Sequence, residues 1–89
     1  MTSNQEIKNL FTNELLNTPQ YQIIKKIKQH ILDEIAAPNI QENFIYNFEI
    51  PQTIEEQSII SMCSIIEFGF PLNNMSECCV CIDMKKFLN

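Results

Sequence analysis

The sequence contains no arginine, no tryptophan and a single glycine, Gly69. Phosphate-binding loops and dinucleotide-binding folds each need several glycines, so the sequence excludes both. Without arginine, the chain lacks the planar, two-pronged group that grips phosphates and reads bases. The longest apolar runs are short stretches such as Cys78 to Ile82. They fall far below the ~18–20 residues that cross a membrane.

Positive charge is also scarce in the second half of the chain. Residues 1–38 carry four lysines and four acids, whereas residues 39–89 carry seven acids and two lysines, which gives the net charge of −5. Nonspecific nucleic-acid binders need many cations, so an acidic half predicts that nucleic acid is not a partner. The start of the chain is polar, with no signal-peptide pattern. We therefore expect no membrane association and a cytoplasmic, reducing compartment.

What is present is enough for one small core. The 89 residues are 45% hydrophobic and include fifteen isoleucines, which predicts a single globular domain over residues 1–89. The abundance of isoleucine and asparagine is typical of an AT-rich genome and fits a phage, viral or AT-rich bacterial source. A domain of this size is only marginally stable alone, which favours self-association.

Two helices joined by a very short turn are predicted first. Ser3 and Glu6 have capping-box spacing, and the apolar residues behind them predict a helix over residues 4–16. Thr18 and Pro19 then begin a second helix, as its N-cap and its first helical residue. This helix ends just before the next proline, and its apolar stripe consists of Ile23, Ile24, Ile27, Ile31 and Ile35.

Two strands and a third helix are predicted to follow. Alternation of apolar and polar residues predicts a strand over 44–50, whose inward residues are Phe44, Tyr46, Phe48 and Ile50. Segment 53–68 fits a strand or a helix, and the capping box of Thr53 and Glu56 favours the helix. A last strand is predicted over 78–84 with Cys78, Val80 and Ile82 facing in. The order predicts an α+β domain with an N-terminal helical hairpin, a mostly α fold being the alternative.

The helix over 53–68 has one face richer in apolar residues than the other. Its predicted buried face consists of Ile59, Ile60, Met62, Cys63 and Ile66. The predicted opposite, polar face consists of Gln57, Ser61 and Ser64.

Residues that carry chemistry are few. The cluster Cys78, Cys79 and Cys81 could bind a soft metal if His30 or Cys63 completed a tetrahedral site. The usual paired ligand spacing is missing, and free cysteines are among the most buried residues, so reduced thiols packed in the core are favoured. His30 is the single candidate base and no nucleophile motif accompanies it. We therefore expect no metal, no cofactor and no catalytic residue.

The second helix offers a further apolar flank. With Ile27 at the centre of the buried face, Tyr21 and Leu32 project from another flank beside Lys25 and Lys28. We expect Tyr21 and Leu32 to stay partly exposed in a monomer and to bind a partner. The favoured function is a small, acidic, non-enzymatic protein-binding module, such as a phage- or virus-encoded inhibitor or accessory protein that occupies a partner surface.

Two alternative functions stay open. The first is a metal-binding protein that uses the C-terminal cysteine cluster. The second is a nucleic-acid mimic, whose acidic set would be Glu42, Glu49, Glu55 and Glu56.

Overall fold

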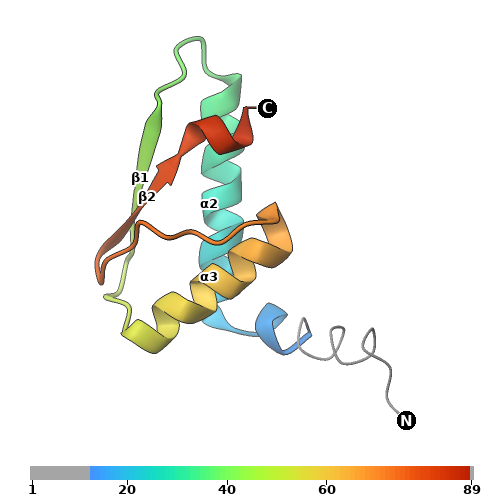
Figure 1. Cartoon of the computed structure of the whole chain (residues 1–89), viewed down its shortest axis with the longest axis vertical. Coiled ribbons are helices and arrows are strands. Elements are labelled where there is room, and N and C mark those ends of the chain that lie inside the picture. Colours follow the sequence, from blue (N-terminus) through green and yellow to red (C-terminus); the bar gives the residue numbers. More distant parts are fainter. Residues whose placement is uncertain (1–12, 89) are drawn as a thin grey trace.

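The computed structural model describes residues 13–88 of the chain. Its elements are the helix α2 (Pro19–Ala36), the strand β1 (Asn43–Asn47), the helix α3 (Ile54–Phe68), the strand β2 (Cys79–Asp83) and the 3-10 helix η1 (Met84–Phe87) (Figure 1). A further helical stretch at residues 13–16 leads into α2 through a two-residue turn. This order confirms the α+β class. The capping box of Ser3 and Glu6, and most of the helix predicted over 4–16, lie outside the described residues.

The helix α2 begins and ends where the sequence predicts. The Thr18 side chain accepts a hydrogen bond from the Tyr21 N–H, and Pro19 occupies the first helical position. The chain leaves the helix at Ala37, whose extended backbone suits the residue before a proline. The stripe is buried at Ile24, Ile27 and Ile31, whereas Ile35 in the last turn is exposed.

The segment after β1 is helical, as its capping box predicts. Thr53 and Glu56 exchange both bonds of the box, from the Glu56 N–H to the threonine hydroxyl and from the Thr53 N–H to the glutamate carboxylate. Gly69 ends α3 with φ 86°, a left-handed conformation that glycine adopts without strain. Its N–H donates to the Ile65 carbonyl.

The face predicted for α3 is wrong in part. Ser64 is fully buried, whereas Ile66 is exposed. The cause lies in segment 70–72, which runs back along the helix. The Ser64 hydroxyl accepts from the Leu72 N–H at 3.0 Å and lies 3.0 Å from the Phe70 carbonyl oxygen, while the Ser61 hydroxyl donates to the Leu72 carbonyl at 2.9 Å. Serines therefore face inward because a loop needs their hydrogen bonds.

The two strands form an antiparallel sheet that is shorter than predicted at the end where β1 stops and β2 begins. Tyr46 pairs with Val80, and the strands β1 and β2 end at Asn47 and begin at Cys79. Ile50 and Cys78, both predicted to face the core, lie outside the two strands, although the Phe48 N–H still donates to the Cys78 carbonyl. Ile50 is 71% exposed and Cys78 sits in the exposed turn before β2. The other predicted inward residues are confirmed, since Tyr46, Val80 and Ile82 lie in the core and Phe44 and Phe48 pack against it.

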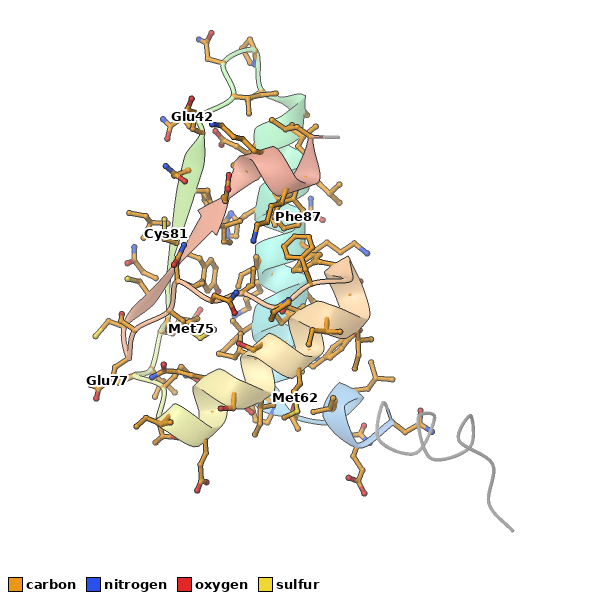
Figure 2. The ribbon with its side chains drawn as sticks, viewed as in Figure 1. Glu42, Met62, Met75, Glu77, Cys81 and Phe87 are labelled. Atoms are coloured by element: carbon orange, nitrogen blue, oxygen red, sulfur yellow. The ribbon has the colours of Figure 1, made fainter. Side chains whose placement is uncertain are left out.

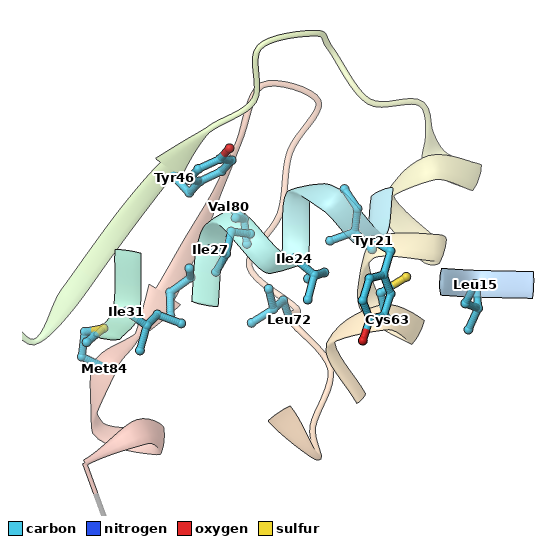
Figure 3. Packing of buried hydrophobic residues seen from close by; sticks show 12 residues of the cluster. Leu15, Tyr21, Ile24, Ile27, Ile31, Tyr46, Cys63, Leu72, Val80 and Met84 are labelled. Atoms are coloured by element: carbon cyan, nitrogen blue, oxygen red, sulfur yellow. The ribbon is translucent and has the colours of Figure 1, made fainter. Parts of the chain in front are cut away.

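The core lies where α2 packs on α3 and on the inner face of the sheet (Figure 3). Its fully buried side chains include Ile24 and Ile27 of α2, Ile60 of α3 and Val80 of β2. Met84 closes the core from η1. The helices and strands therefore each direct one apolar face toward a shared core.

Candidate functional site

Three of the four predicted partner-binding residues gather around one carboxylate of α3. The Tyr21 hydroxyl donates to Glu67 Oε2 at 2.5 Å, and the Lys28 ammonium donates to Glu67 Oε1 at 2.6 Å. The Lys25 ammonium lies 5.6 Å from the centre of the Tyr21 ring. This cluster joins α2 to α3 within one chain.

The electrostatics of this cluster keep the Tyr21 phenol protonated and the Glu67 carboxylate ionised at neutral pH. Burial, followed by the hydrogen bond to Glu67, raises the pKa of the Tyr21 phenol from 10.0 to about 12. The hydrogen bonds from Lys28 and then from Tyr21 lower the pKa of Glu67. The phenol is therefore a protonated donor and the carboxylate a charged acceptor, a combination that gives short and strong hydrogen bonds.

The prediction that Tyr21 stays partly exposed is wrong. The helix α3 covers Tyr21, which is only 3% exposed, so a partner has no access to this side chain. Leu32 behaves as predicted, since it is 51% exposed. It lies one turn beyond Lys28 on the same helix face. Its role in binding a partner stays a prediction.

Another flank of α2 forms an open groove of about 350 Å³. The first two turns of α2, the chain between β1 and α3, and the first turn of α3 build it, and they meet at the lower part of Figure 1. Its apolar lining residues are Pro19, Ile23, Tyr46 and Ile50. Pockets that receive a small molecule or an anchoring side chain start near this volume, at roughly 300 Å³.

Two buried glutamines form the polar part of this groove. The Gln20 amide donates to Glu56 Oε2 at 3.1 Å and lies 3.4 Å from the Gln52 amide oxygen. The Gln52 amide in turn donates to the Ile50 carbonyl at 2.7 Å. Within residues 13–88, every buried side-chain nitrogen and oxygen has a hydrogen-bond partner. The polar groups thus satisfy one another.

The rim of the groove is charged but balanced. The Lys26 ammonium lies 3.2 Å from a Glu49 carboxylate oxygen, and both side chains are mostly exposed. An exposed ion pair contributes little stability, typically below about 1 kcal/mol. The pair neutralises its own two charges, and the third charged lining residue, Glu56, accepts hydrogen bonds from Gln20 and from the Thr53 N–H. The groove therefore suits an uncharged, apolar occupant.

No family model, no curated protein and no solved structure matches this chain. Its function therefore has to be inferred from its own surfaces. Among residues 13–88, no helix is both long enough and apolar enough to cross a membrane.

The proposed metal ligands do not come together. The His30 ring stacks near Phe44 and Tyr46, with ring centres 5.7 and 5.6 Å away. Those aromatic residues lie on the inner face of the sheet, whereas Cys79 and Cys81 alternate with the inward residues of β2 and lie on the outer face. In the described part of the chain, no three histidine, cysteine or acidic side chains are grouped in a way that could hold a metal ion.

The cysteines divide into one core thiol and three nearer the solvent. Cys63 is fully buried against α2, and burial raises the pKa of its thiol. Cys78 is exposed, which corrects the prediction that it faces the core, and Cys79 and Cys81 are half-buried. Figure 2 shows Cys81 in β2 and Glu77 at the tip of the preceding turn.

Three members of the acidic set are engaged within the chain. Glu49 pairs with Lys26, Glu56 completes the capping box, and Glu42 lies 4.0 Å from the Lys85 ammonium. An acidic mimic needs carboxylates free to meet a basic partner. Glu42 and Glu49 stay 78% exposed in spite of these contacts, so the mimic alternative stays a prediction.

The important residues that sequence reasoning missed are Glu67, Gln20 and Gln52. For two of them, Glu67 and Gln20, the sequence contains a feature that could have indicated their role. Glu67 lies in the last turn of a helix, where the helix dipole disfavours a carboxylate, which points to a cation from elsewhere. Gln20 lies on the same helical stripe as Ile24 and Ile27, and a polar side chain on an apolar stripe needs a hydrogen-bond partner.

Proposed function

We propose that this chain is a small, non-enzymatic protein-binding module whose groove receives an uncharged apolar side chain of a partner protein. The observation that carries the proposal is Ile50, which lines the groove and is 71% exposed. A large aliphatic side chain kept at a concave surface, beside polar groups that already satisfy one another, favours an apolar anchor. Such a module fits an inhibitor or accessory protein that occupies its partner's surface.

The surroundings of His30 support a function without catalysis. A histidine base needs a nucleophile within hydrogen-bond reach. In residues 13–88, no hydrogen bond joins His30 to a cysteine, serine or threonine, and its ring packs instead on two aromatic residues. We include a cytoplasmic, reducing setting in the proposal, because three free thiols are reached by solvent. A disulfide in native protein isolated without oxidant would contradict this setting.

Selection of binders from a random peptide library tests the groove. We expect the selected peptides to share an aliphatic or aromatic residue. The variant Ile50→Asp should bind them about tenfold more weakly or worse, because a buried anchor would then meet a carboxylate. The matched control is Leu32→Asp, which changes an exposed aliphatic residue on another flank of α2 and should leave binding unchanged.

The two aspartate variants separate two surfaces. Circular dichroism should show that both variants fold. Peptides that lose affinity for Leu32→Asp and keep it for Ile50→Asp would move the interface to the flank predicted from the sequence. Peptides indifferent to both substitutions, or no peptides at all, would contradict the proposal.

A further inference from the structure

The strand β1 lies at the edge of the sheet. The strand β2 lies in the middle, since it pairs with β1 on one side and with Met75 on the other. The ladder between β1 and β2 extends at both ends, from the Phe48 N–H to the Cys78 carbonyl at 2.8 Å and from the Met84 N–H to the Glu42 carbonyl at 2.9 Å. In an antiparallel pair, residues that bond to the neighbour alternate with residues that do not.

This alternation leaves one edge of β1 open. The even-numbered residues direct their N–H and C=O groups toward β2, so Asn43, Ile45 and Asn47 direct theirs away from it. No other segment within residues 13–88 supplies a backbone hydrogen bond to these three residues. Unpaired groups along a sheet edge are a template for another strand.

The open edge also lacks the devices that usually protect one. Lysines, prolines and bulges commonly keep edge strands from pairing. The strand β1 has the sequence NFIYN, with no charge and no proline, and it pairs one-to-one with β2 from Asn43 to Asn47. The Ile45 side chain is 59% exposed on its outer face. The strand itself therefore carries none of these obstacles to pairing.

We propose that β1 pairs with β1 of a second copy of this chain, antiparallel, about a two-fold axis at Ile45. In this register Ile45 lies opposite Ile45 of the second copy, and Asn43 lies opposite Asn47. A two-fold interface is self-complementary, so residues at equal distances from the axis have to suit one another. The strand meets this condition, since an aromatic residue and then an asparagine flank Ile45 on both sides. A strand of a different protein would not require this symmetry.

The charges near the edge allow an acidic chain to meet itself. Glu42 and Glu49 stand at unequal distances from Ile45, so in this register Glu42 faces Phe48 and Glu49 faces Gln41 of the second copy. Like charges directly opposite one another would destabilise the pairing, and none occur. Glu49 is in addition paired with Lys26. The inference rests on this strand edge alone and is independent of the groove.

Substitution of Ile45 by residues of opposite charge tests both the interface and the position of its two-fold axis. In sedimentation equilibrium we expect dimers of the wild type, and monomers of both Ile45→Lys and Ile45→Glu, because two like charges would then lie opposite one another. An equimolar mixture of the two variants should dimerise, because an ammonium then meets a carboxylate. Ile54→Lys, at a highly exposed aliphatic residue of α3, is the control and should dimerise like the wild type.

A backbone variant makes the same test without a charge. Asn47→Pro removes an N–H that points away from β2, and edge strands tolerate proline there. We expect circular dichroism to show a folded protein whose dimer dissociates at least about tenfold more readily. A wild type that stays monomeric at every concentration, an Ile45→Lys variant that still dimerises, or a mixture that stays monomeric would overturn the proposal.

Discussion

The helix α2 contacts the rest of the molecule on two sides that are completed in different ways. Toward α3, side-chain hydrogen bonds close the contact, with Tyr21 and Lys28 both bound to Glu67. Toward the sheet, apolar side chains fill the inner face, whereas Ile45 is exposed on the outer face. At the edge of β1, the outward backbone groups have no backbone partner among residues 13–88.

This difference separates the part of the molecule that holds the fold from the part that is available to partners. The hydrogen-bonded groups between α2 and α3 make the packing of the two helices specific, but they are already bonded to one another rather than available to a partner protein. Open backbone groups and exposed aliphatic residues cost little in a monomer and gain most when another chain covers them. The sheet side and the lip of the groove are therefore where we expect binding.

Matched truncations of isoleucine should show the largest difference between the two sides. Ile27→Ala removes a fully buried side chain and leaves a cavity, so we expect a loss of about 2–5 kcal/mol in the free energy of unfolding. Ile45→Ala, on the outer face of the sheet, should cost less than about 1 kcal/mol. Urea denaturation measures both at a protein concentration where the chain is monomeric. Equal losses would show that the outer face is covered after all.

Removal of one serine hydroxyl should have the next largest effect. Ser64→Ala leaves the buried Leu72 N–H without its acceptor, which should cost about 1–3 kcal/mol. The control is Ser58→Ala, because the Ser58 hydroxyl bonds only to the exposed Ile54 carbonyl of its own helix. That substitution should change the free energy of unfolding by less than about 0.5 kcal/mol. If the two variants unfold alike, Ser64 does not hold segment 70–72.

Loss of the Tyr21 hydroxyl should have a smaller effect than loss of the Ser64 hydroxyl, and this effect should depend on pH. Tyr21→Phe should cost about 1 kcal/mol near neutral pH, because Lys28 still neutralises Glu67. The pKa of Tyr21 is raised to about 12 in the fold, so its contribution is complete below pH 10 and is lost as pH rises toward 12. The gap in unfolding free energy between wild type and variant should therefore narrow above pH 10. A gap that is constant with pH would contradict this account.

In acid, the same cluster should lose stability as the pH falls rather than as it rises. The pKa of Glu67 is lowered in the fold, so its contribution is present at neutral pH and is lost as pH falls through the acid range. Glu67→Gln removes that dependence, and the wild type should approach the variant in stability as the solution is acidified. A gap that widens in acid would mean that Glu67 is not held by Lys28.

The ends of the helices were predictable from the sequence because caps act over three or four residues. Thr18 with Pro19, and Thr53 with Glu56, begin α2 and α3 as predicted. The buried face of α3 was not predictable in full, since Ser64 faces inward only because segment 70–72 returns to it. The limits of the strands likewise depend on where two distant segments stop pairing.

The candidate site was less predictable than the fold. The sequence singled out Tyr21 and Lys28 but could not show that Glu67, thirty-nine residues beyond Lys28, would bind both. The groove is lined by three separate stretches of chain, and its residues become neighbours only after folding. Leu32 was correctly predicted to be exposed, because exposure on a helix follows from position around its axis.

The inward hydroxyl of Ser64 also governs how this part of the molecule opens. Segment 70–72 has no regular secondary structure, and backbone amides in such segments commonly exchange their hydrogens with water in small local fluctuations. The Leu72 amide is different, because its acceptor sits on the inner face of α3. We expect its hydrogen to reach water only when the helix and the segment separate. Leu72 should therefore exchange at the slow rate of the α3 backbone, as a member of the same cooperative unit.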